Sequence, residues 1–269
     1  MVRSLFHRGP DEEGSIVLAE AALGMRRLAI VDLSGGQQPF ANEDATIQVV
    51  TNGEIYNFED VKRELIAHGH AFHTRSDIEI VAHAYEQWGE GFVSRLRGMF
   101  AIALWDGRTR TLIAARDRAG EKPLYYAHTR KGLVLASELK ALLTRPDVPR
   151  ELDPEALDQF LTYEYVISPR TILKGVRRLP AAHYLRYRDG ELTVHRYWDA
   201  ASVPVKDWTD ADAVEALRAA LARAVDSQMM SDVPLGVFLS GGIDSTAIVT
   251  FMAEAAARRG VSLNTFSMG

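Results

Sequence analysis

Short apolar runs, separated by turn residues, dominate the first half of the chain. They occupy residues 16–18, 28–31, 47–50, 100–105, 112–115, 124–127 and 133–136. Runs of this length that are bounded by Gly- and Asp-containing turns are typical of β-strands. The last four follow one another between residues 99 and 137, so we expect them to form a β meander.

Two segments carry their apolar residues at helical spacing instead. Residues 58–67 and 80–88 are therefore predicted to be helices. The second helix is preceded by Ser76-Asp77-Ile78-Glu79, which matches a capping box. Asp77 then complements the helix dipole, or its carboxylate pairs with the ammonium group of a substrate. Both interpretations stay open.

The pattern changes near residues 146–154, where prolines and alternating charges indicate a linker. We therefore divide the chain into domains 1–148 and 149–269. In the second domain, residues 209–229 predict an amphipathic helix whose apolar stripe, which includes Val214 and Leu217, is expected to be buried.

Residues 234–245, Pro-Leu-Gly-Val-Phe-Leu-Ser-Gly-Gly-Ile-Asp-Ser, are typical of a strand, a tight turn and the start of a helix. The apolar run 235–239 predicts a strand that is buried on both faces, and the two glycines allow a sharp turn close to a ligand. The helix that follows presents its N-terminal N–H groups to this turn, which suits an anion.

The polar side chains of this turn refine the expected ligand. Ser240 and Ser245 add donors for phosphate oxygens, whereas Asp244 would repel a bare phosphate and is interpreted as a partner of Mg²⁺ that bridges phosphates. The common phosphate loop has Lys followed by Ser or Thr after its second Gly, but here Ile243 follows Gly242. A plain strand-to-helix turn is the alternative.

Composition narrows the class of protein. The 269 residues are 47% apolar and 25% charged, as in ordinary globular proteins, and the length suggests two domains or one large one. A net charge of −5 gives no electrostatic case for nucleic acid or an anionic membrane. No apolar run reaches membrane-spanning length and no signal peptide is visible, so a cytoplasmic location is expected.

Two polar positions beside predicted strands suggest a site for a small molecule. Arg27 leads into the run 28–31 and could hold a carboxylate through a bidentate fork; a surface Arg pair is the alternative. Asn52-Gly53 normally signals a hairpin turn, but an Asn amide beside a Gly N–H also suits an oxyanion hole. Residues 116–123 are dense in charge and predict a solvated or salt-bridged rim.

Several stretches together resemble glutamine-dependent asparagine synthetases, in that family's order and over nearly the whole chain. They are His7-Arg8-Gly9-Pro10-Asp11, residues 26–32, Gln38-Pro39, residues 52–57, Ser76-Asp77-Ile78-Glu79, Arg116-Asp117-Arg118, residues 122–126, residues 137–142 and the 240–245 loop. The resemblance implies an α+β N-terminal-nucleophile (Ntn) hydrolase sandwich, which is a glutamine amidotransferase type 2 domain. A partial α/β ATP-pyrophosphatase domain (adenine nucleotide alpha hydrolase-like) follows it.

In that family, glutamine is hydrolysed in the first domain. The released ammonia then reaches aspartate, which ATP has activated as β-aspartyl-adenylate in the second. The resemblance thus implies an asparagine synthase, a carbon–nitrogen ligase with glutamine as the amido donor and with ATP and Mg²⁺ as cofactors. Its partners are the small molecules glutamine, aspartate and ATP, with no nucleic acid and no membrane, and a homodimer is compatible with it.

The resemblance also assigns roles to residues. Asn52 and the N–H of Gly53 become the oxyanion hole. The glutamine-binding set is Arg27, Leu28, Ala29, Ile30, Val31, Asn52, Gly53, Glu54 and Asp77. Within it, Arg27 holds the α-carboxylate, while Glu54 and Asp77 hold the α-ammonium. The ATP-binding set is Leu239, Ser240, Gly241, Gly242, Asp244 and Ser245, with Asp244 also as the metal-binding residue.

Two departures from the family pattern bear on activity. The family's nucleophilic cysteine is missing, since the sequence has no Cys, and family members extend beyond Gly269. We therefore expect the chain by itself to be inactive. The alternatives are a related amidotransferase or β-lactam-synthetase-like enzyme with another acceptor, and a non-catalytic module that binds glutamine or a nucleotide.

Overall fold

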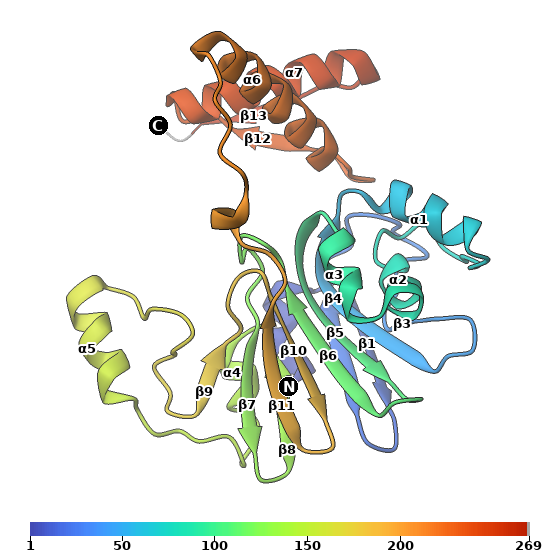
Figure 1. Ribbon diagram of the computed structural model, residues 1–269, viewed down its shortest axis with the longest axis vertical. Coiled ribbons are helices and arrows are strands. Elements are labelled where there is room, and N and C mark those ends of the chain that lie inside the picture. The colour runs from blue at the N-terminus through green and yellow to red at the C-terminus, as the bar shows by residue number, and fades with distance from the viewer. Residues whose placement is uncertain (268–269) are drawn as a thin grey trace. The chain divides into compact units, whose positions relative to one another are not determined.

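A computed structural model describes residues 1–267. The chain divides into two compact units, Met1–Ala200 and Ala201–Gly269, and Figure 1 shows the elements of each. None of the helices in the described residues combines the length and the apolar character that crossing a membrane requires.

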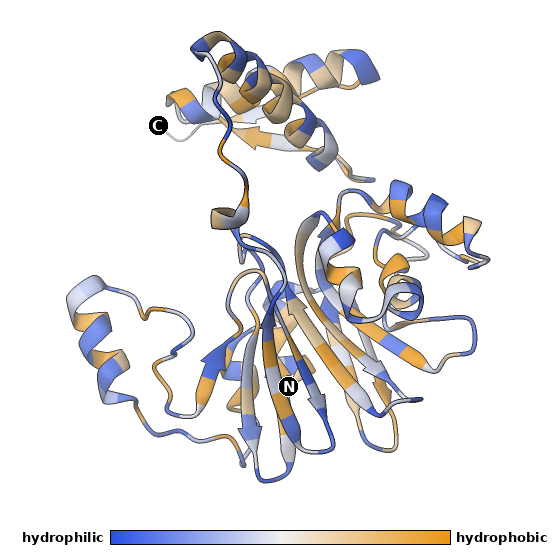
Figure 2. Cartoon of the chain, viewed as in Figure 1, coloured by the Kyte–Doolittle hydropathy of each residue, from blue (hydrophilic) through white to orange (hydrophobic). Residues whose placement is uncertain are grey.

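The centre of the first unit is an antiparallel sheet of six strands in the order β11-β10-β6-β5-β4-β3. Their bounds are Glu191–Arg196 (β11), His183–Arg188 (β10), Thr111–Arg116 (β6), Gly98–Asp106 (β5), Ile47–Ile55 (β4) and Phe40–Ala41 (β3). Every residue of β6 is buried, so both faces of the sheet are covered there. Figure 2 shows hydrophobic residues gathered on the strands and hydrophilic ones on the turns between them.

Helices cover one face of this sheet. They are α1 (Phe58–Ala67), α2 (Ile80–Trp88), a 3-10 turn at Gly89–Gly91 and α3 (Phe92–Arg95). In α1, Val61 and Leu65 are buried, and their separation of four residues places them on one side of the helix. All residues of α2 from Ile80 to Tyr85 are buried. They share one hydrophobic core with Ile102 and Leu104 of β5.

Two smaller sheets pack on the opposite face. β1 (Glu12–Val17) pairs with β2 (Ala22–Arg27), and a second sheet has the order β8-β7-β9. The strands of the latter are Gly132–Ala136 (β8), Tyr125–Thr129 (β7) and Val176–Arg178 (β9). Leu23 of β2 is buried with Trp105 of β5, and Leu124 beside β7 is buried with Leu185 of β10. The first unit is therefore a sandwich of β-layers with helices packed on it.

The remaining helices of this unit are short. They are a 3-10 helix at Val2–Arg8, α4 (Leu139–Leu142) and α5 (Pro154–Tyr163). Asp153 caps α5, since its side chain accepts hydrogen bonds from the N–H groups of Glu155 and Ala156, and a proline at the first helical position suits this start.

The strand pairing corrects two expectations. β5 and β6 form a hairpin, but β7 and β8 lie in another sheet, so residues 99–137 are not one meander. The first unit also continues to Ala200, past the expected boundary at 148/149, because β10 pairs with β6 and β9 pairs with β7. The segment taken for a linker is a connection inside the unit, where Val148 is buried.

Residues 201–267 of the second unit hold two helices and two parallel strands. They are α6 (Asp210–Gln228), β12 (Gly236–Phe238), α7 (Ile243–Arg259) and β13 (Asn264–Phe266), after a 3-10 turn at Ala200–Ser202. Thr209 caps α6 by accepting a hydrogen bond from the Asp212 N–H at 3.2 Å. Gly260 ends α7 with φ +66°, the left-handed conformation that commonly follows a helix.

Two expectations for this unit differ from the structure. Val214 and Leu217 of the α6 stripe are 61% and 60% exposed, and Phe238 of β12 is 73% exposed. Within residues 1–267, β12 has β13 as its one strand partner. The core of the unit is the smaller cluster Met229, Met252, Ala255 and Ala256, so the predicted burial of the stripe and of both strand faces is wrong for the described residues.

Candidate functional site

Asn52-Gly53 lies inside β4 and not at a hairpin turn. Asn52 is opposite Ala101 of β5, and Gly53 is opposite Phe100. Gly53 has φ +148°, and a Cβ at this position would stand 1.9 Å from the carbonyl oxygen of Met99. Glycine is therefore required here by backbone conformation and by space, and the hairpin-turn interpretation is wrong.

Beyond its short pairing with β3, one edge of β4 is lined by side chains. Alternate N–H groups of a strand point to the same edge, here those of Thr51, Gly53 and Ile55. The Thr51 N–H donates to Gln38 Oε1 at 2.6 Å, and the Ile55 N–H donates to Asp77 Oδ2 at 2.7 Å. The Gly53 N–H therefore points from this edge between the two acceptors.

A cavity of about 210 Å³ opens at this edge. It is lined by eight members of the expected glutamine-binding set, namely Arg27, Leu28, Ile30, Val31, Asn52, Gly53, Glu54 and Asp77. Ala29 does not border it, and its N–H donates to Asp11 Oδ2 at 2.9 Å. Asn52 Nδ2 is buried without a hydrogen-bond partner in residues 1–267, so an amide donor is available at the cavity wall.

Arg27 is buried, and three hydrogen bonds hold its guanidinium in place. It donates to Glu12 Oε2 at 2.8 Å and to the carbonyl oxygens of Val31 at 2.6 Å and Asp32 at 2.9 Å. A guanidinium has five N–H donors, so Nε–H and one Nη1–H remain, and they point in different directions. Residues 28–31 are not the expected strand: the Val31 carbonyl oxygen pairs with Arg27 and the Ala29 N–H pairs with Asp11.

Two carboxyl groups stand in the cavity, and their pKa values are shifted upward. Burial raises the pKa of Asp77 to about 7; the Ile55 N–H opposes this shift, and the charge of Glu54 adds to it. Burial also raises the pKa of Glu54, against the nearby charge of Lys122. A ligand ammonium group between these carboxyl groups would favour their ionised forms, so the pair is suited to bind one.

The segment Ser76 to Glu79 does not form the expected capping box. Glu79 Oε1 accepts a hydrogen bond from the His73 N–H at 2.8 Å, and Glu79 Oε2 accepts one from the Thr74 N–H at 2.9 Å. Asp77 bonds to β4 and does not cap α2. The two carboxylates instead fix the segment before α2 against the edge of the sheet, which places Asp77 in the cavity.

The charged segment 116–123 is buried at its start and is not a solvated rim. The Arg116 guanidinium donates to the carbonyl oxygens of Lys122 at 2.7 Å and Leu179 at 2.8 Å, and to that of Gly120. Asp117 is fully buried, and its Oδ2 accepts a hydrogen bond from the Lys122 N–H at 3.0 Å. Buried polar groups need such partners, so these charges shape the loop that carries Lys122.

Some cavity residues were not in the predicted set. Gln38, Ser76, Met99 and Lys122 also line it. Gln38 and Lys122 belong to stretches on which the family resemblance rests, so the resemblance could have identified them as cavity residues. Met99 offers no such signal, because it borders the cavity through the pairing of β5 with β4.

In the second unit, residues 239–245 adopt the expected turn between strand and helix. The Leu239 N–H donates to the Phe266 carbonyl oxygen at 2.8 Å, which continues the contact between β12 and β13. Gly241 then turns the chain with φ +80°, a conformation that favours glycine. Gly242 is the N-cap residue of α7.

The hydroxyl groups of this turn converge. Ser240 Oγ and Ser245 Oγ are 3.0 Å apart, and the Ser245 hydroxyl donates to the Gly242 carbonyl oxygen at 3.1 Å. Asp244 lies in the first turn of α7, and it and Ser240 are exposed. An exposed helix N-terminus with two hydroxyls beside it suits a phosphate group, and a carboxylate there suits a bridging Mg²⁺.

The geometry of the first unit thus brings a guanidinium, two carboxyl groups and an amide donor to one cavity. Residues 1–198 match the family described as "Glutamine amidotransferase domain", and residues 216–269 match the family described as "Asparagine synthase". The chain therefore belongs to the glutamine amidotransferase domain family. The two matches confirm the predicted fold class and the resemblance to glutamine-hydrolysing asparagine synthetases.

Several known proteins are similar to the chain. The chain is 38% identical over 272 residues to "Asparagine synthetase [glutamine-hydrolyzing] 3" of Bacillus subtilis, covering 100% of this chain and 44% of that protein. It is 40% identical over 254 residues to "Amidase chyE" of Penicillium rubens, covering 92% and 37%. A solved glutamine phosphoribosylpyrophosphate amidotransferase of B. subtilis aligns with TM-score 0.47 and 20% identity, over 91% of this chain and 51% of that one. The chain spans less than half the length of the two curated relatives.

Proposed function

We propose that the chain is part of a glutamine-hydrolysing asparagine synthetase, and that its first unit binds free glutamine at the edge of β4. The observation that carries the proposal is one cavity that brings together the buried Arg27, the unpartnered amide of Asn52 and the carboxyl group of Asp77. An amino acid with a side-chain amide offers the complementary groups, namely a carboxylate, an ammonium and a carbonyl.

Each group of glutamine then has a named partner. The α-carboxylate pairs with the charge of Arg27 and takes one of the guanidinium N–H donors that Glu12, Val31 and Asp32 leave over. The α-ammonium lies between Glu54 and Asp77. Asn52 Nδ2 and the Gly53 N–H both donate to the oxygen of the side-chain amide. Because hydrolysis develops negative charge on that oxygen, donors fixed in advance stabilise the transition state more than the ground state.

The same proposal assigns ATP and Mg²⁺ to the second unit. The hydroxyls of Ser240 and Ser245 and the N-terminal N–H groups of α7 hold the pyrophosphate, with Gly241 and Gly242 giving the backbone room to approach it. Asp244 is the metal partner, and Leu239 lies beside the adenosine. When bound, ATP supplies the adenylyl group that activates the acceptor carboxylate.

Calorimetry on the 269-residue chain tests the glutamine site. We expect glutamine to bind and not to be hydrolysed, because the sequence lacks the cysteine nucleophile. Arg27→Lys keeps the charge but loses the guanidinium that Glu12, Val31 and Asp32 hold in place, so binding should weaken at least tenfold, by about 1.4 kcal/mol. Arg63→Lys, on an exposed helix face, is the control. The proposal would be contradicted if the folded wild-type chain did not bind glutamine. It would also be contradicted if the Arg27→Lys variant bound glutamine as tightly as the wild type does.

The phosphate site is tested separately with a fluorescent ATP analogue and Mg²⁺. The double change Ser240→Ala and Ser245→Ala should weaken binding, and Asp244→Asn should remove its dependence on Mg²⁺. Ser227→Ala, an exposed serine on α6, should leave the affinity unchanged. Equal affinity in all four proteins would contradict the assignment of ATP to this turn.

A second candidate is an amidotransferase that acts on an acceptor other than aspartate. The observation that favours it is the 40% identity to a relative named as an amidase. Exchange of labelled pyrophosphate into ATP, measured with the gene product, separates the two. Dependence of the exchange on aspartate supports the synthetase, and exchange that needs another carboxylic acid supports the second candidate.

The proposal also includes a cellular location and an oligomeric state. A cytoplasmic location gives access to glutamine, aspartate, ATP and Mg²⁺, and fractionation of cells that express a tagged gene product tests it. A homodimer is compatible with the proposal, and light scattering of the purified protein measures the oligomeric state.

A further inference from the structure

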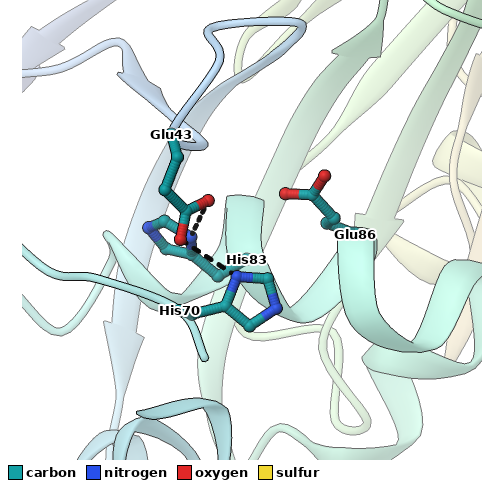
Figure 3. A group of neighbouring side chains, drawn as sticks. All are labelled: Glu43, His70, His83 and Glu86. Carbon is teal, nitrogen blue, oxygen red and sulfur yellow. Dashed lines mark hydrogen bonds and ion pairs between the residues drawn. The ribbon is translucent and has the colours of Figure 1, made fainter. Parts of the chain in front are cut away.

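Four side chains with metal-binding atoms meet on the helical side of the first unit, away from the glutamine cavity's lining (Figure 3). Glu43 follows β3, His70 follows α1, and His83 and Glu86 both lie on α2. One ligand atom from each residue can be chosen so that all four atoms lie within 4.8 Å of one another.

The distances within the cluster fit a single small ion. His70 Nδ1 is 3.1 Å from Glu43 Oε1, and His83 Nδ1 is 3.1 Å from Glu43 Oε2. In a tetrahedral zinc site with bonds of about 2.0 Å, neighbouring ligand atoms are about 3.3 Å apart. Small shifts of these side chains would therefore place an ion among them.

Both histidines turn a ring nitrogen toward the same carboxylate, that of Glu43. The carboxylate only accepts hydrogen bonds, so both imidazoles turn an N–H toward it. The buried His83 Nε2 has no partner in the described part of the chain. For a divalent ion to bind both Nδ1 atoms, each neutral imidazole would carry its proton on Nε2 instead.

We propose that Glu43, His70, His83 and Glu86 bind one divalent transition-metal ion of the zinc class. Two imidazole nitrogens favour zinc over magnesium or calcium, which prefer oxygen ligands alone. The two carboxylates balance the charge of the ion.

Neighbouring groups orient the fourth ligand. Glu86 Oε2 accepts a hydrogen bond from Asn42 Nδ2 at 2.8 Å, and Glu86 Oε1 pairs with Arg108 at 2.9 Å. Each carboxylate oxygen has two lone pairs, so these bonds leave capacity for the ion and fix the direction of the carboxylate. Contacts of this kind are common around metal ligands.

The ion would join three parts of the fold. It links the turn after β3, the segment after α1 and the helix α2, and the segment between His70 and α2 carries Asp77. Metal binding would thus brace the chain that leads into the amino-acid cavity, in a way that does not depend on which amino acid the cavity takes.

The test is metal binding by the full 269-residue chain, with ZnCl₂ in calorimetry and CoCl₂ in absorption spectroscopy. We expect one equivalent of zinc per chain, a cobalt spectrum of the intense tetrahedral type, and a higher melting temperature with zinc. His70→Gln should lower the zinc affinity at least about a hundredfold, since even groups outside the ligand set change it by about 10–100-fold. Glu43→Gln should do the same.

His68→Gln is the matched control, because it removes a nearby exposed histidine outside the cluster and should leave zinc binding unchanged. Circular dichroism establishes that each variant is folded. The proposal is overturned if the folded wild-type chain binds no stoichiometric zinc. It is also overturned if His70→Gln and Glu43→Gln, both folded, bind zinc as tightly as His68→Gln does.

Discussion

Replacing Asp77 by Asn removes a buried ionisable group and keeps its shape. Asp77 Oδ2 accepts the hydrogen bond from the Ile55 N–H at 2.7 Å, and the side-chain oxygen of Asn can accept the same bond. Asp77→Asn therefore isolates the cost of ionising this carboxyl group in the folded protein. It changes little else at the edge of β4.

The size of that cost follows from the pKa of Asp77, which rises from the ordinary 3.8 to about 7 on folding. Because the folded-state pKa lies above the unfolded one, the folded protein binds the proton more tightly. The stabilising contribution is complete below pH 3.8 and is lost as the pH rises through about 7. Each pKa unit is worth about 1.4 kcal/mol, so the full loss is roughly 4 kcal/mol.

Urea unfolding at about pH 5 and about pH 8.5 measures the effect. Roughly two pH units lie between pH 5 and the folded-state pKa of Asp77, which is about 7. The wild type should therefore lose roughly 3 kcal/mol of stability relative to Asp77→Asn when the pH is raised from about 5 to about 8.5. The exposed Asp158→Asn is the control and should show no such change. A stability difference between Asp77→Asn and wild type that is the same at both pH values would refute the reasoning.

Three other predictions follow from single features. Gly53→Ala should destabilise the first unit by about 3 kcal/mol or more in thermal unfolding. Gly91→Ala is the control and should not destabilise it, because a Cβ at Gly91 meets open space. A Gly53→Ala protein as stable as the wild type would contradict the steric argument. Arg116→Lys should cost about 2–4 kcal/mol in urea unfolding. The single nitrogen of Lys cannot reach the three carbonyl groups that Arg116 meets with three separate nitrogens. A loss below about 1 kcal/mol would contradict this reasoning. Residues 1–148 alone should aggregate in size-exclusion chromatography, since β6 loses its partner, while residues 1–200 should elute as a monomer; the reverse order would contradict the assigned boundary.

Much of the local structure could be predicted from the sequence. Helices at 58–67 and 80–88, and the turn between strand and helix at 240–245, follow from spacing and glycine content, which act within a few residues. The set of cavity residues came almost entirely from the family resemblance. In the structure eight of its members line one space, while the roles assigned to them stay predictions.

What the local pattern could not supply was the partner of each segment. Asn52-Gly53 has the composition of a turn, yet pairing with β5 holds it extended. Arg116 belongs to a run of charges that indicates solvent, yet it is buried, and one of its carbonyl partners is that of the distant Leu179. Both errors arise because tertiary contacts decide these positions, and such contacts are invisible to a window of neighbouring residues.

The distance along the chain between β6 and β10 determines when the two strands can pair during synthesis. β6 ends at Arg116 and β10 begins at His183, and a ribosome adds about 5–20 residues per second. Roughly 3 to 13 s therefore pass in which β6 has emerged and its neighbour has not. During that interval the growing chain exposes an apolar strand edge, so chaperones that bind nascent chains have a defined segment and a defined window in which to act.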